Sequence, residues 1–356
     1  MPHGRISDMK RQRKRWFFWL GLGISAVFLF FAFREIDYTK LWQTLLTTQW
    51  LWLLPGLVVY FLAVLVRSWR WQYLVKPLER ISLATLFPII NIGYMGNNVF
   101  PLRMGEILRA VVLKRREGVA ISGTLATIIV ERIFDAVVVV GFVLLNLGRL
   151  TGTSTFSQIG SLATWAVIIF LAGLAIFILI AIFPKPATNL IHAVIMRLLP
   201  DRWQDAVISI IDKFLEGLMS LRSPKDAVMI LLTSILIWLM ETGLYWTVNQ
   251  ALGLDLDFGQ LMLLNGVVNL VLLIPAAPGG LGTFDAAGRA VLEAFSIPAE
   301  PALGYTLVLR IALWVPITLV GTAYFAREGL KWTTDVNEME AQAEANETIQ
   351  PKGKNQ

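Results

Sequence analysis

Three charged residues, Glu131, Arg132 and Asp135, lie in the middle of an apolar run at 120–146. If this run is a helix, Glu131 and Asp135 share a face at a spacing of four residues, and Arg132 reaches Asp135 at a spacing of three. A lone charge at the centre of a bilayer costs on the order of 2.5–3.5 kcal/mol. We therefore expect these charges to face the interior of a helix bundle, where they either form structural ion pairs or bind a charged ligand.

Two further charges lie inside apolar runs in the second half of the chain, Glu241 at 227–250 and Arg310 at 301–325. If the buried charges only form structural ion pairs, Arg310 is the expected partner of Glu131 or Glu241. If they bind a ligand, the arginines would hold an anionic group and the carboxylates would balance them.

Two other apolar stretches are interrupted by proline and glycine in the same way. The first interruption spans 97–106 and the second spans 274–285, and we expect each to be followed by a long apolar helix with an arginine inside it. In membrane proteins, interrupted segments at corresponding places in two halves point to a transport site.

Glycines and arginines at these interruptions suit an anionic ligand. Gly279, Gly280 and Gly282 would let backbone N–H groups approach an anion at the start of a helix. Arg103 and Arg109 would add planar guanidinium groups that can hold phosphate oxygens. Two simpler interpretations stay open: the glycines serve close helix packing, and the arginines anchor the cytoplasmic surface.

The composition is that of an integral membrane protein. Hydrophobic residues make up 56% of the 356 positions, charged residues make up 16%, and the mean hydropathy is +0.63, whereas a soluble domain averages about 25% charged residues. We expect full spans at 16–33, 50–67, 120–146, 161–183, 227–250 and 301–325. Tryptophans near the span ends are expected at the membrane interface: Trp16, Trp19, Trp42, Trp50, Trp52, Trp69 and Trp71.

The net charge of +6 is distributed as the positive-inside rule requires, rather than as a nucleic-acid-binding patch. Basic residues precede the first span, follow the second and precede the third: Lys10, Arg11, Arg13, Lys14, Arg15, Arg67, Arg70, Lys76, Arg80, Arg109, Lys114, Arg115 and Arg116. We expect a multi-pass protein of the cytoplasmic membrane with both termini in the cytoplasm and no nucleic-acid partner. The absence of cysteine excludes disulfides and thiolate chemistry.

The fold class that we expect is all-α, with six full spans and two re-entrant hairpins, and eight full spans are the alternative. If 83–100 crossed the membrane fully, the basic residues at 114–116 would face outward, so a hairpin is expected there and a second one at 259–276. The expected domain organisation lists a basic cytoplasmic arm at 1–15, a membrane domain at 16–330, a cytoplasmic connector at 186–224 with an amphipathic helix at 206–215, and a disordered cytoplasmic tail at 333–356.

Identities at a nearly constant offset predict an inverted repeat with halves at 50–146 and 227–325. The third and sixth spans are three crossings apart, so they run in opposite directions, as in many secondary transporters. The matching positions are separated by the same interval along the sequence, or by nearly the same interval for the last pair: Pro101 and Pro278, Gly105 and Gly282, Ala110 and Ala287, Arg132 and Arg310.

The order of three motifs resembles the lysylphosphatidylglycerol synthase transmembrane-domain family, the flippase-like membrane region of the bacterial multiple peptide resistance factor. The motifs are P-x-R-x-G-E-x-x-R at 101–109, E-R-x-x-D at 131–135 and P-G-G-x-G at 278–282, and the resemblance covers about residues 15–330. In two-domain members this region is taken to flip an aminoacylated phospholipid that a separate soluble domain makes. We expect a stand-alone member without that domain, so the resemblance implies no lysyl transfer.

The leading hypothesis is a lipid translocase, not an enzyme, without cofactor or metal. It would move an anionic or aminoacylated phospholipid, or a polyprenyl-phosphate-linked lipid, with membrane lipids and a separate lipid-modifying enzyme as expected partners. The alternatives are a membrane enzyme or subunit for glycosyl or aminoacyl transfer to lipid head groups, and a proton-coupled solute transporter. The residues expected to bind the ligand are Asn98, Arg103, Glu106, Arg109, Glu131, Arg132, Asp135, Gly279, Gly280, Gly282, Asp285 and Arg310, with Glu241 as a further ion-pair partner.

Overall fold

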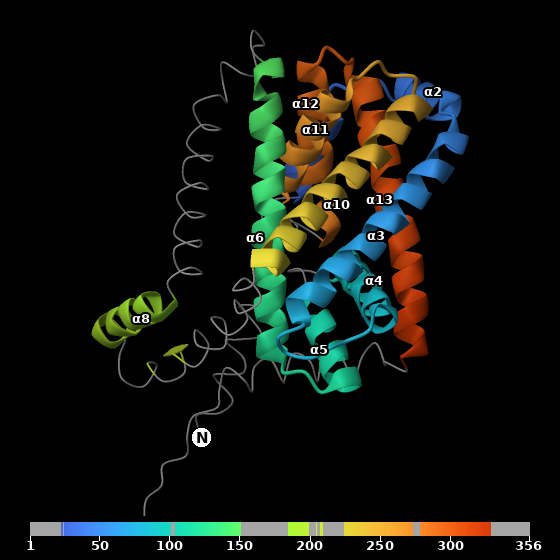
Figure 1. The fold of residues 1–356 in the computed structure, drawn as a ribbon. Coiled ribbons are helices and arrows are strands. Elements are labelled where there is room, and N and C mark those ends of the chain that lie inside the picture. Colours follow the sequence, from blue (N-terminus) through green and yellow to red (C-terminus); the bar gives the residue numbers. More distant parts are fainter. Residues whose placement is uncertain are drawn as a thin grey trace, which may run out of the picture.

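The computed structural model describes residues 23, 25–100, 104–150, 184–198, 204, 207–208, 224–272 and 278–328. In this part of the chain the regular elements are helices, and it contains no strand. Eight of the helices pack together as a bundle (Figure 1). The all-α prediction is therefore confirmed for the described residues.

The bundle consists of two sets of four helices. Along the chain, each set contains a long helix, then two short helices, then a second long helix. The first set is α3 (Leu53–Val75), α4 (Leu83–Val99), α5 (Gly105–Glu117) and α6 (Ile121–Asn146). The second set is α10 (Pro224–Ala251), α11 (Phe258–Val271), α12 (Thr283–Ala294) and α13 (Ala299–Arg327).

Three helical segments are long and apolar enough to cross a membrane: Trp50–Val75, Lys225–Ala251 and Ala299–Arg327. They correspond to the spans expected at 50–67, 227–250 and 301–325, although the first continues well beyond its expected end. Helix α6 has 26 residues and a length of about 39 Å, but it carries three charges near its middle. Of the span expected at 16–33, residues 25–33 are described as helical, and the one at 161–183 lies outside the described residues.

The two interrupted stretches form helical hairpins. Helices α4 and α5 flank the interruption at 100–104, and α11 and α12 flank the one at 272–282. With 17, 13, 14 and 12 residues, the four arms are about 18–26 Å long, which is less than the roughly 30 Å hydrocarbon core of a bilayer. Figure 1 places α4 and α5 in the lower half of the bundle and α11 and α12 in the upper half.

Each hairpin extends further along the chain than the sequence predicted. The expected hairpins at 83–100 and 259–276 include only the first arm, since the interruptions were expected to lead directly into long helices. In the structure a short second arm begins at Gly105 and at Thr283, and only then follows the long helix α6 or α13.

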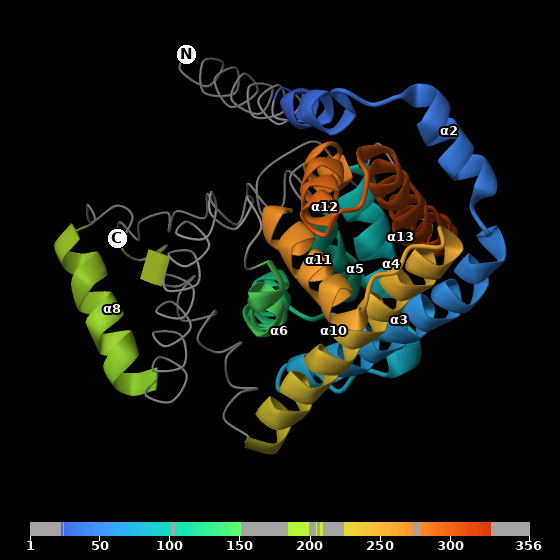
Figure 2. The same cartoon turned by 90° about the horizontal axis from the view of Figure 1, so that it is seen from above.

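The contacts from the first set of helices to the second match those from the second to the first. Helix α3 lies along α10, α4 packs on α13, and α11 packs on α6 (Figure 2). Each hairpin therefore contacts the last long helix of the other set. The short turn η5 (Pro278–Gly280) of the second hairpin also contacts α4 of the first.

Glycines allow the arms of the first hairpin to approach closely. A Cβ atom on Gly105 would lie 1.9 Å from the carbonyl oxygen of Gly93, and one on Gly93 would lie 2.4 Å from Cγ of Arg109. The side-chain oxygen of Asn97 accepts a hydrogen bond from the N–H of Gly105 at 3.0 Å, which satisfies a donor at the start of α5. Any other residue at 93 or 105 would push the arms apart.

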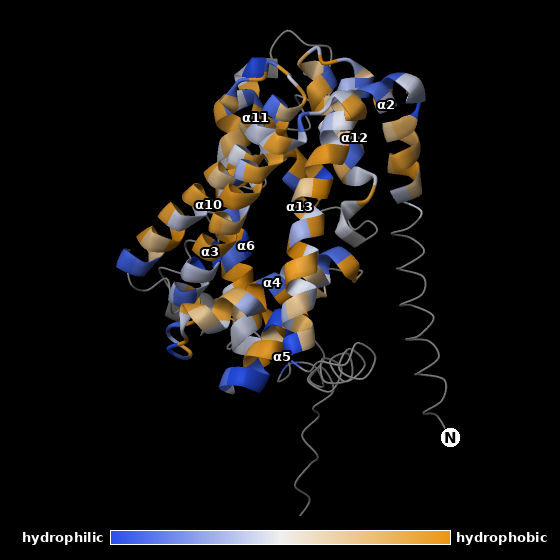
Figure 3. Cartoon of the chain, turned by 90° about the vertical axis from the view of Figure 1, so that its right-hand side faces the viewer, coloured by the Kyte–Doolittle hydropathy of each residue, from blue (hydrophilic) through white to orange (hydrophobic). Residues whose placement is uncertain are grey.

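Two further helices, α2 (Tyr38–Thr47) and α8 (Pro184–Leu198), lie outside the bundle of eight. Helix α2 is capped by the preceding Asp37, whose carboxylate accepts hydrogen bonds from two backbone N–H groups, and α2 packs on α13. Helix α8 overlaps the first part of the connector expected at 186–224. Of the amphipathic helix expected at 206–215, only Val207 and Ile208 are described, and the terminal segments 1–15 and 333–356 lie outside the described residues. Figure 3 shows hydrophobic residues along most of the bundle and hydrophilic ones at the lower end of α5.

Candidate functional site

The charged residues of α6 lie at the centre of a buried cluster. Glu131 and Asp135 are 1% and 6% exposed. Arg109 of α5 binds Glu131 through two hydrogen bonds, of 3.2 and 3.0 Å. Arg70 of α3 donates to Asp135 and lies 3.4 Å from Oε1 of Glu131. Arg132 pairs with Glu131 and lies 3.5 Å from Asp135, so the contact expected from the spacing of three residues is present.

Aromatic side chains and hydroxyl groups surround this cluster. The ring of Trp71 lies 4.1 Å from the guanidinium carbon of Arg109, and its N–H donates to Thr127. The N–H of Trp238 donates to Asp135 at 3.1 Å, and Arg70 also donates to Ser234. Because the rings cover the charged groups and the hydrogen bonds satisfy many of them, the cluster can remain ionised inside an apolar bundle.

A second buried ion pair lies beside the cluster. Arg67 of α3 pairs with Glu241 of α10 and donates to the hydroxyl of Tyr94 on α4 at 3.2 Å. Its guanidinium carbon is 5.8 Å from the ring of Trp238, which in turn bonds to Asp135. Through these contacts, charged residues of α3, α5, α6 and α10 are joined in one buried network.

Positive groups outnumber negative ones within ion-pair distance in the α6 cluster. Three arginines meet two carboxylates there, and Arg132 is the most accessible member, with 33% of its side chain exposed against 9% or less for the others. The accessible edge of Arg132 is therefore where a negatively charged group would meet the cluster.

Arg310 and Asp285 form a separate site in the second set. Arg310 of α13 pairs with Asp285 of α12 and lies 3.4 Å from the carbonyl oxygen of Gly280. The rings of Trp314 and Phe284 lie 4.9 and 5.2 Å from its guanidinium carbon. The expectation that Arg310 would pair with Glu131 or Glu241 is wrong, because the local turn of the second hairpin brings Asp285 to it while those two carboxylates are held by other arginines.

The glycines before α12 have both a conformational and a packing role. Gly279, Gly280 and Gly282 have φ angles of +64°, +65° and +84°, in the region that favours glycine. A Cβ on Gly279 would lie 1.8 Å from the Trp314 ring. Asp285 accepts a hydrogen bond from the N–H of Gly282 at 3.1 Å, so in this structure the start of α12 is capped by a carboxylate of the chain itself.

Two of the remaining expected site residues, Asn98 and Glu106, lie on the first hairpin. Asn98 of α4 donates to the hydroxyl of Thr318 on α13 at 2.9 Å, so it joins the two sets of helices. Glu106 is half-buried in the first turn of α5. Arg103 lies outside the described residues. The structure thus brings together Arg109, Glu131, Arg132 and Asp135, and it brings Asp285 and Arg310 together elsewhere.

Sequence reasoning missed Arg70 and Trp71 of the main cluster and Arg67 of the ion pair beside it. The two arginines were expected to flank a span on the cytoplasmic side and Trp71 to lie at the membrane interface, but they are 6%, 0% and 0% exposed. They are buried because α3 continues to Val75 and packs along α10. The signal was the spacing of 67, 70 and 71, which places all three on one face of a helix.

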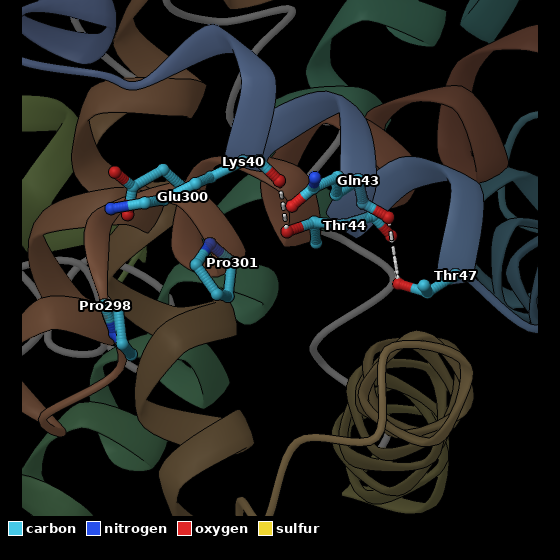
Figure 4. Close-up of a pocket in the computed structure, with 7 residues that line it drawn as sticks. All are labelled: Lys40, Gln43, Thr44, Thr47, Pro298, Glu300 and Pro301. Atoms are coloured by element: carbon cyan, nitrogen blue, oxygen red, sulfur yellow. Dashed lines mark hydrogen bonds between the residues drawn. The ribbon is translucent and has the colours of Figure 1, made fainter.

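The pocket in Figure 4 lies away from these charged clusters. It is formed between α2 and the start of α13, and its lining residues are Lys40, Gln43, Thr44, Thr47, Pro298, Glu300 and Pro301. None of the expected site residues lines it. Its hydroxyl groups are bonded to backbone carbonyls of their own helix, as for Thr44 to Lys40 at 3.0 Å.

Comparison with known proteins places the chain among membrane proteins. The glycosyltransferase AglD of Haloferax volcanii is 26% identical over 302 residues, which are 75% of this chain and 48% of AglD, so the match spans about half of that relative. A UPF0104 membrane protein of Methanothermobacter thermautotrophicus is 22% identical over 327 residues, or 87% of this chain and 92% of the relative. One from Methanocaldococcus jannaschii is 21% identical over 309 residues, covering 84% and 91%.

The model of one protein family matches most of the sequence, including both sets of helices and both clusters of charged residues. It is described as the lysylphosphatidylglycerol synthase TM region and matches residues 18–321. Together with the long apolar helices, this match shows that the chain is a membrane protein with transmembrane helices and that it belongs to the lysylphosphatidylglycerol synthase transmembrane-region family.

Proposed function

We propose that this protein is a lipid translocase that moves a lipid with an anionic head group across the cytoplasmic membrane. The observation that carries the proposal is the cluster around Glu131, in which three arginines meet two carboxylates and Arg132 keeps an accessible edge. Charged groups inside a membrane bundle are costly and typically mark a substrate pathway. A phosphate on a lipid head group would bind the accessible edge of Arg132.

The arrangement of the helices supports movement between two states. We propose that the two sets form an inverted repeat and that α4–α5 and α11–α12 are re-entrant hairpins from opposite sides. Both sets have the same order of long and short helices, and each hairpin packs on the last helix of the other set. Rocking of one set against the other would expose the bound head group to each side in turn. The acyl chains could stay in the lipid, so only the polar part needs shelter.

The basic residues fit an orientation with α5 on the cytoplasmic side. The last turn of α5 contains Lys114, Arg115 and Arg116, and the end of α13 contains Arg327, which follows the positive-inside pattern. In this orientation the first hairpin would enter from the cytoplasm and the second from outside.

The test is lipid movement in liposomes that contain the purified protein and a trace of fluorescent phosphatidylglycerol. In empty liposomes, dithionite bleaches only the outer leaflet, whereas with the active protein it bleaches both. We expect Arg132→Gln to slow this movement about tenfold or more, because a charged hydrogen bond to the phosphate is lost. Arg149→Gln, which removes an ion pair with Asp257 at an exposed end of the bundle, is the matched control and should move lipid as the wild type does.

Two results would contradict the translocase. One is wild-type protein that is folded in the liposomes but leaves the inner leaflet protected with every lipid tried, including a labelled polyprenyl phosphate. The other is an Arg132→Gln variant that moves lipid at the wild-type rate. Lipid-independent uptake of a small solute by the same vesicles would instead favour a solute transporter.

A second candidate is a role in glycosyl transfer to a lipid, and the printed name of one relative favours it, since AglD is called a glycosyltransferase. The match covers 48% of AglD, so its activity could reside in the remainder. Expression of this chain in a host, followed by mass spectrometry of the lipids, separates the two candidates. A new glycosylated lipid that disappears in a Glu131→Gln variant would favour transfer chemistry, and an unchanged lipid profile would favour translocation.

A further inference from the structure

Beside the turn before α12, the ion pair of Arg310 and Asp285 leaves buried polar atoms unsatisfied. Arg310 is 8% exposed and Asp285 is 1% exposed. The Nε and Nη1 atoms of Arg310 and the Oδ1 atom of Asp285 are buried and have no hydrogen-bond partner among the described residues. A buried donor without a partner costs about 1–3 kcal/mol, so an acceptor that binds these two donors of one guanidinium would be stabilised there.

The same turn has the backbone of an anion site. Gly279, Gly280 and Gly282 adopt positive φ angles directly before a helix of 12 residues, where N–H groups and the helix dipole favour negative charge. A negative group already lies there, because Oδ2 of Asp285 accepts both from the N–H of Gly282 and from Arg310. In this structure a carboxylate of the chain therefore occupies the place of an anion.

We propose that Asp285 is a placeholder in an anion site made by Arg310 and the Gly279–Gly282 turn, and that the phosphate group of a lipid displaces it. This inference rests on the proposed function for the kind of ligand. A phosphate has more acceptor oxygens than a carboxylate, so it could bind the N–H of Gly282 together with the free Nε and Nη1 of Arg310. Asp285 competes with the ligand, and without the ligand it pairs with Arg310, so that this buried arginine keeps a negative partner.

The two sets of helices support this assignment by their contrast. In the first set Arg109 holds Glu131 with both Nη atoms and lies over Trp71. In the second set Arg310 has one Nη atom engaged and the other free. The second ion pair is thus the less saturated of the two, since Arg310 has two donors without a partner, Nε and Nη1, and Arg109 has one, Nε.

The experiment measures binding of short-chain phosphatidic acid to the purified full chain by titration calorimetry, with inorganic phosphate and short-chain diacylglycerol as separate ligands. We expect Asp285→Asn to bind phosphatidic acid about tenfold more tightly than the wild type, because the competing charge is removed while an oxygen remains for the N–H of Gly282. Arg310→Gln should bind it at least about tenfold more weakly. Binding of inorganic phosphate with the same pattern would identify a free phosphate site, and diacylglycerol should not respond to either change.

Asp257→Asn is the matched control. Asp257 also caps a hairpin helix, α11, and also pairs with an arginine, Arg149, but at an exposed end. Its replacement should leave phosphatidic acid binding unchanged. A purely structural ion pair would give a different result. Asp285→Asn and Arg310→Gln would then both lower thermal stability, and the two variants would not shift the affinity for phosphatidic acid in opposite directions.

The failure of this inference is distinguishable from the failure of the proposed function. Wild-type protein that moves lipid while Asp285→Asn binds phosphatidic acid no more tightly would overturn the placeholder role alone. Opposite affinity changes in the two variants of a protein that moves no lipid would retain the anion site and remove the translocase.

Discussion

Arg132 and Arg310 each lie inside the last long helix of their set of four helices. Each arginine lies equally far along the sequence from the first residue of its own long helix, which is α6 for Arg132 and α13 for Arg310. Both pair with a carboxylate, Arg132 with its neighbour Glu131 and Arg310 with Asp285 of the preceding hairpin arm. The sequence interval between Arg132 and Arg310 therefore equals the interval between the first residues of α6 and α13.

The ion pairs between the hairpins and the long helices are reversed in sign between the two sets. In the first set the arginine, Arg109, is on the short arm α5 and the carboxylate, Glu131, is on α6. In the second set the carboxylate, Asp285, is on α12 and the arginine, Arg310, is on α13. The same architecture is thus held together by different residues, which argues that geometry, rather than a particular side chain, is what the two sets share.

Arg70 and Arg132 should separate stability from transport. Arg70 is fully buried between Glu131 and Asp135, so Arg70→Gln leaves buried carboxylates undercompensated and should lower the free energy of unfolding by about 3–5 kcal/mol. Arg132 is partly exposed, and Arg132→Gln should cost about 1 kcal/mol or less while slowing lipid movement. Thermal unfolding in detergent and the liposome assay measure the two effects.

The surface pair of Lys76 and Asp226 is the control for this comparison. Lys76→Gln should change neither quantity. Equal losses of stability in Arg70→Gln and Arg132→Gln would mean that both arginines are structural, which would remove the main support for a ligand at Arg132.

A methyl group on Gly105 should disrupt the first hairpin. The added Cβ would lie 1.9 Å from the carbonyl oxygen of Gly93 and 2.6 Å from the backbone nitrogen of Asn97, and backbone atoms cannot move away cheaply. We expect Gly105→Ala to lower the free energy of unfolding by about 1–3 kcal/mol and to slow lipid movement, as measured by thermal unfolding and dithionite bleaching.

Gly141 provides the matching control in an open position. A Cβ there would meet nothing within 4 Å, so Gly141→Ala in α6 should stabilise the helix by up to about 1 kcal/mol. A Gly105→Ala variant as stable as the wild type would show that the two arms can separate without loss.

The sequence predicted the features that depend on local composition. Run length and hydropathy predict the long helices, and the proline and glycine interruptions predict where the hairpins turn. The reasoning that charges inside α6 must face the interior holds for Glu131 and Asp135, which are buried, but not fully for Arg132, whose side chain is 33% exposed. These properties follow from bilayer thickness and from the cost of burying charge, which act on each segment separately.

The partners of those charges were not predictable in the same way. Arg70 follows an apolar run and precedes a tryptophan, which is the pattern of a membrane-interface anchor. Only the packing of α3 along α10 makes it a buried partner of α6. The pairing of Arg310 with Asp285 likewise depends on the turn at 279–282, whose backbone conformation places the two side chains together. Tertiary contacts, not segment composition, decide such pairs.

Arg109→Lys should show that a positive charge alone is not sufficient at this position. Arg109 binds both oxygens of Glu131 and stacks on Trp71, and a lysine cannot do both. We expect a loss of about 2 kcal/mol in the free energy of unfolding. The control is Arg116, which also binds both oxygens of a glutamate, Glu328, but is 35% exposed. Arg116→Lys should lower the free energy of unfolding by about 0–1 kcal/mol. Equal effects in both variants would place Arg109 in a solvated environment.

The proposed re-entrant hairpins can be tested by single cysteines, because the chain contains none. In the proposed orientation, a bulky membrane-impermeant maleimide should label Lys40→Cys in intact cells, and it should label Lys76→Cys and Lys114→Cys only after permeabilisation. Val99, at the end of α4 and 39% exposed, decides the depth of the turn. If the arms of about 18–26 Å stop inside the roughly 30 Å hydrocarbon core, Val99→Cys should react from neither side. Labelling of Val99→Cys in intact cells would instead mean that α4 and α5 cross the whole membrane, which gives the eight-span topology.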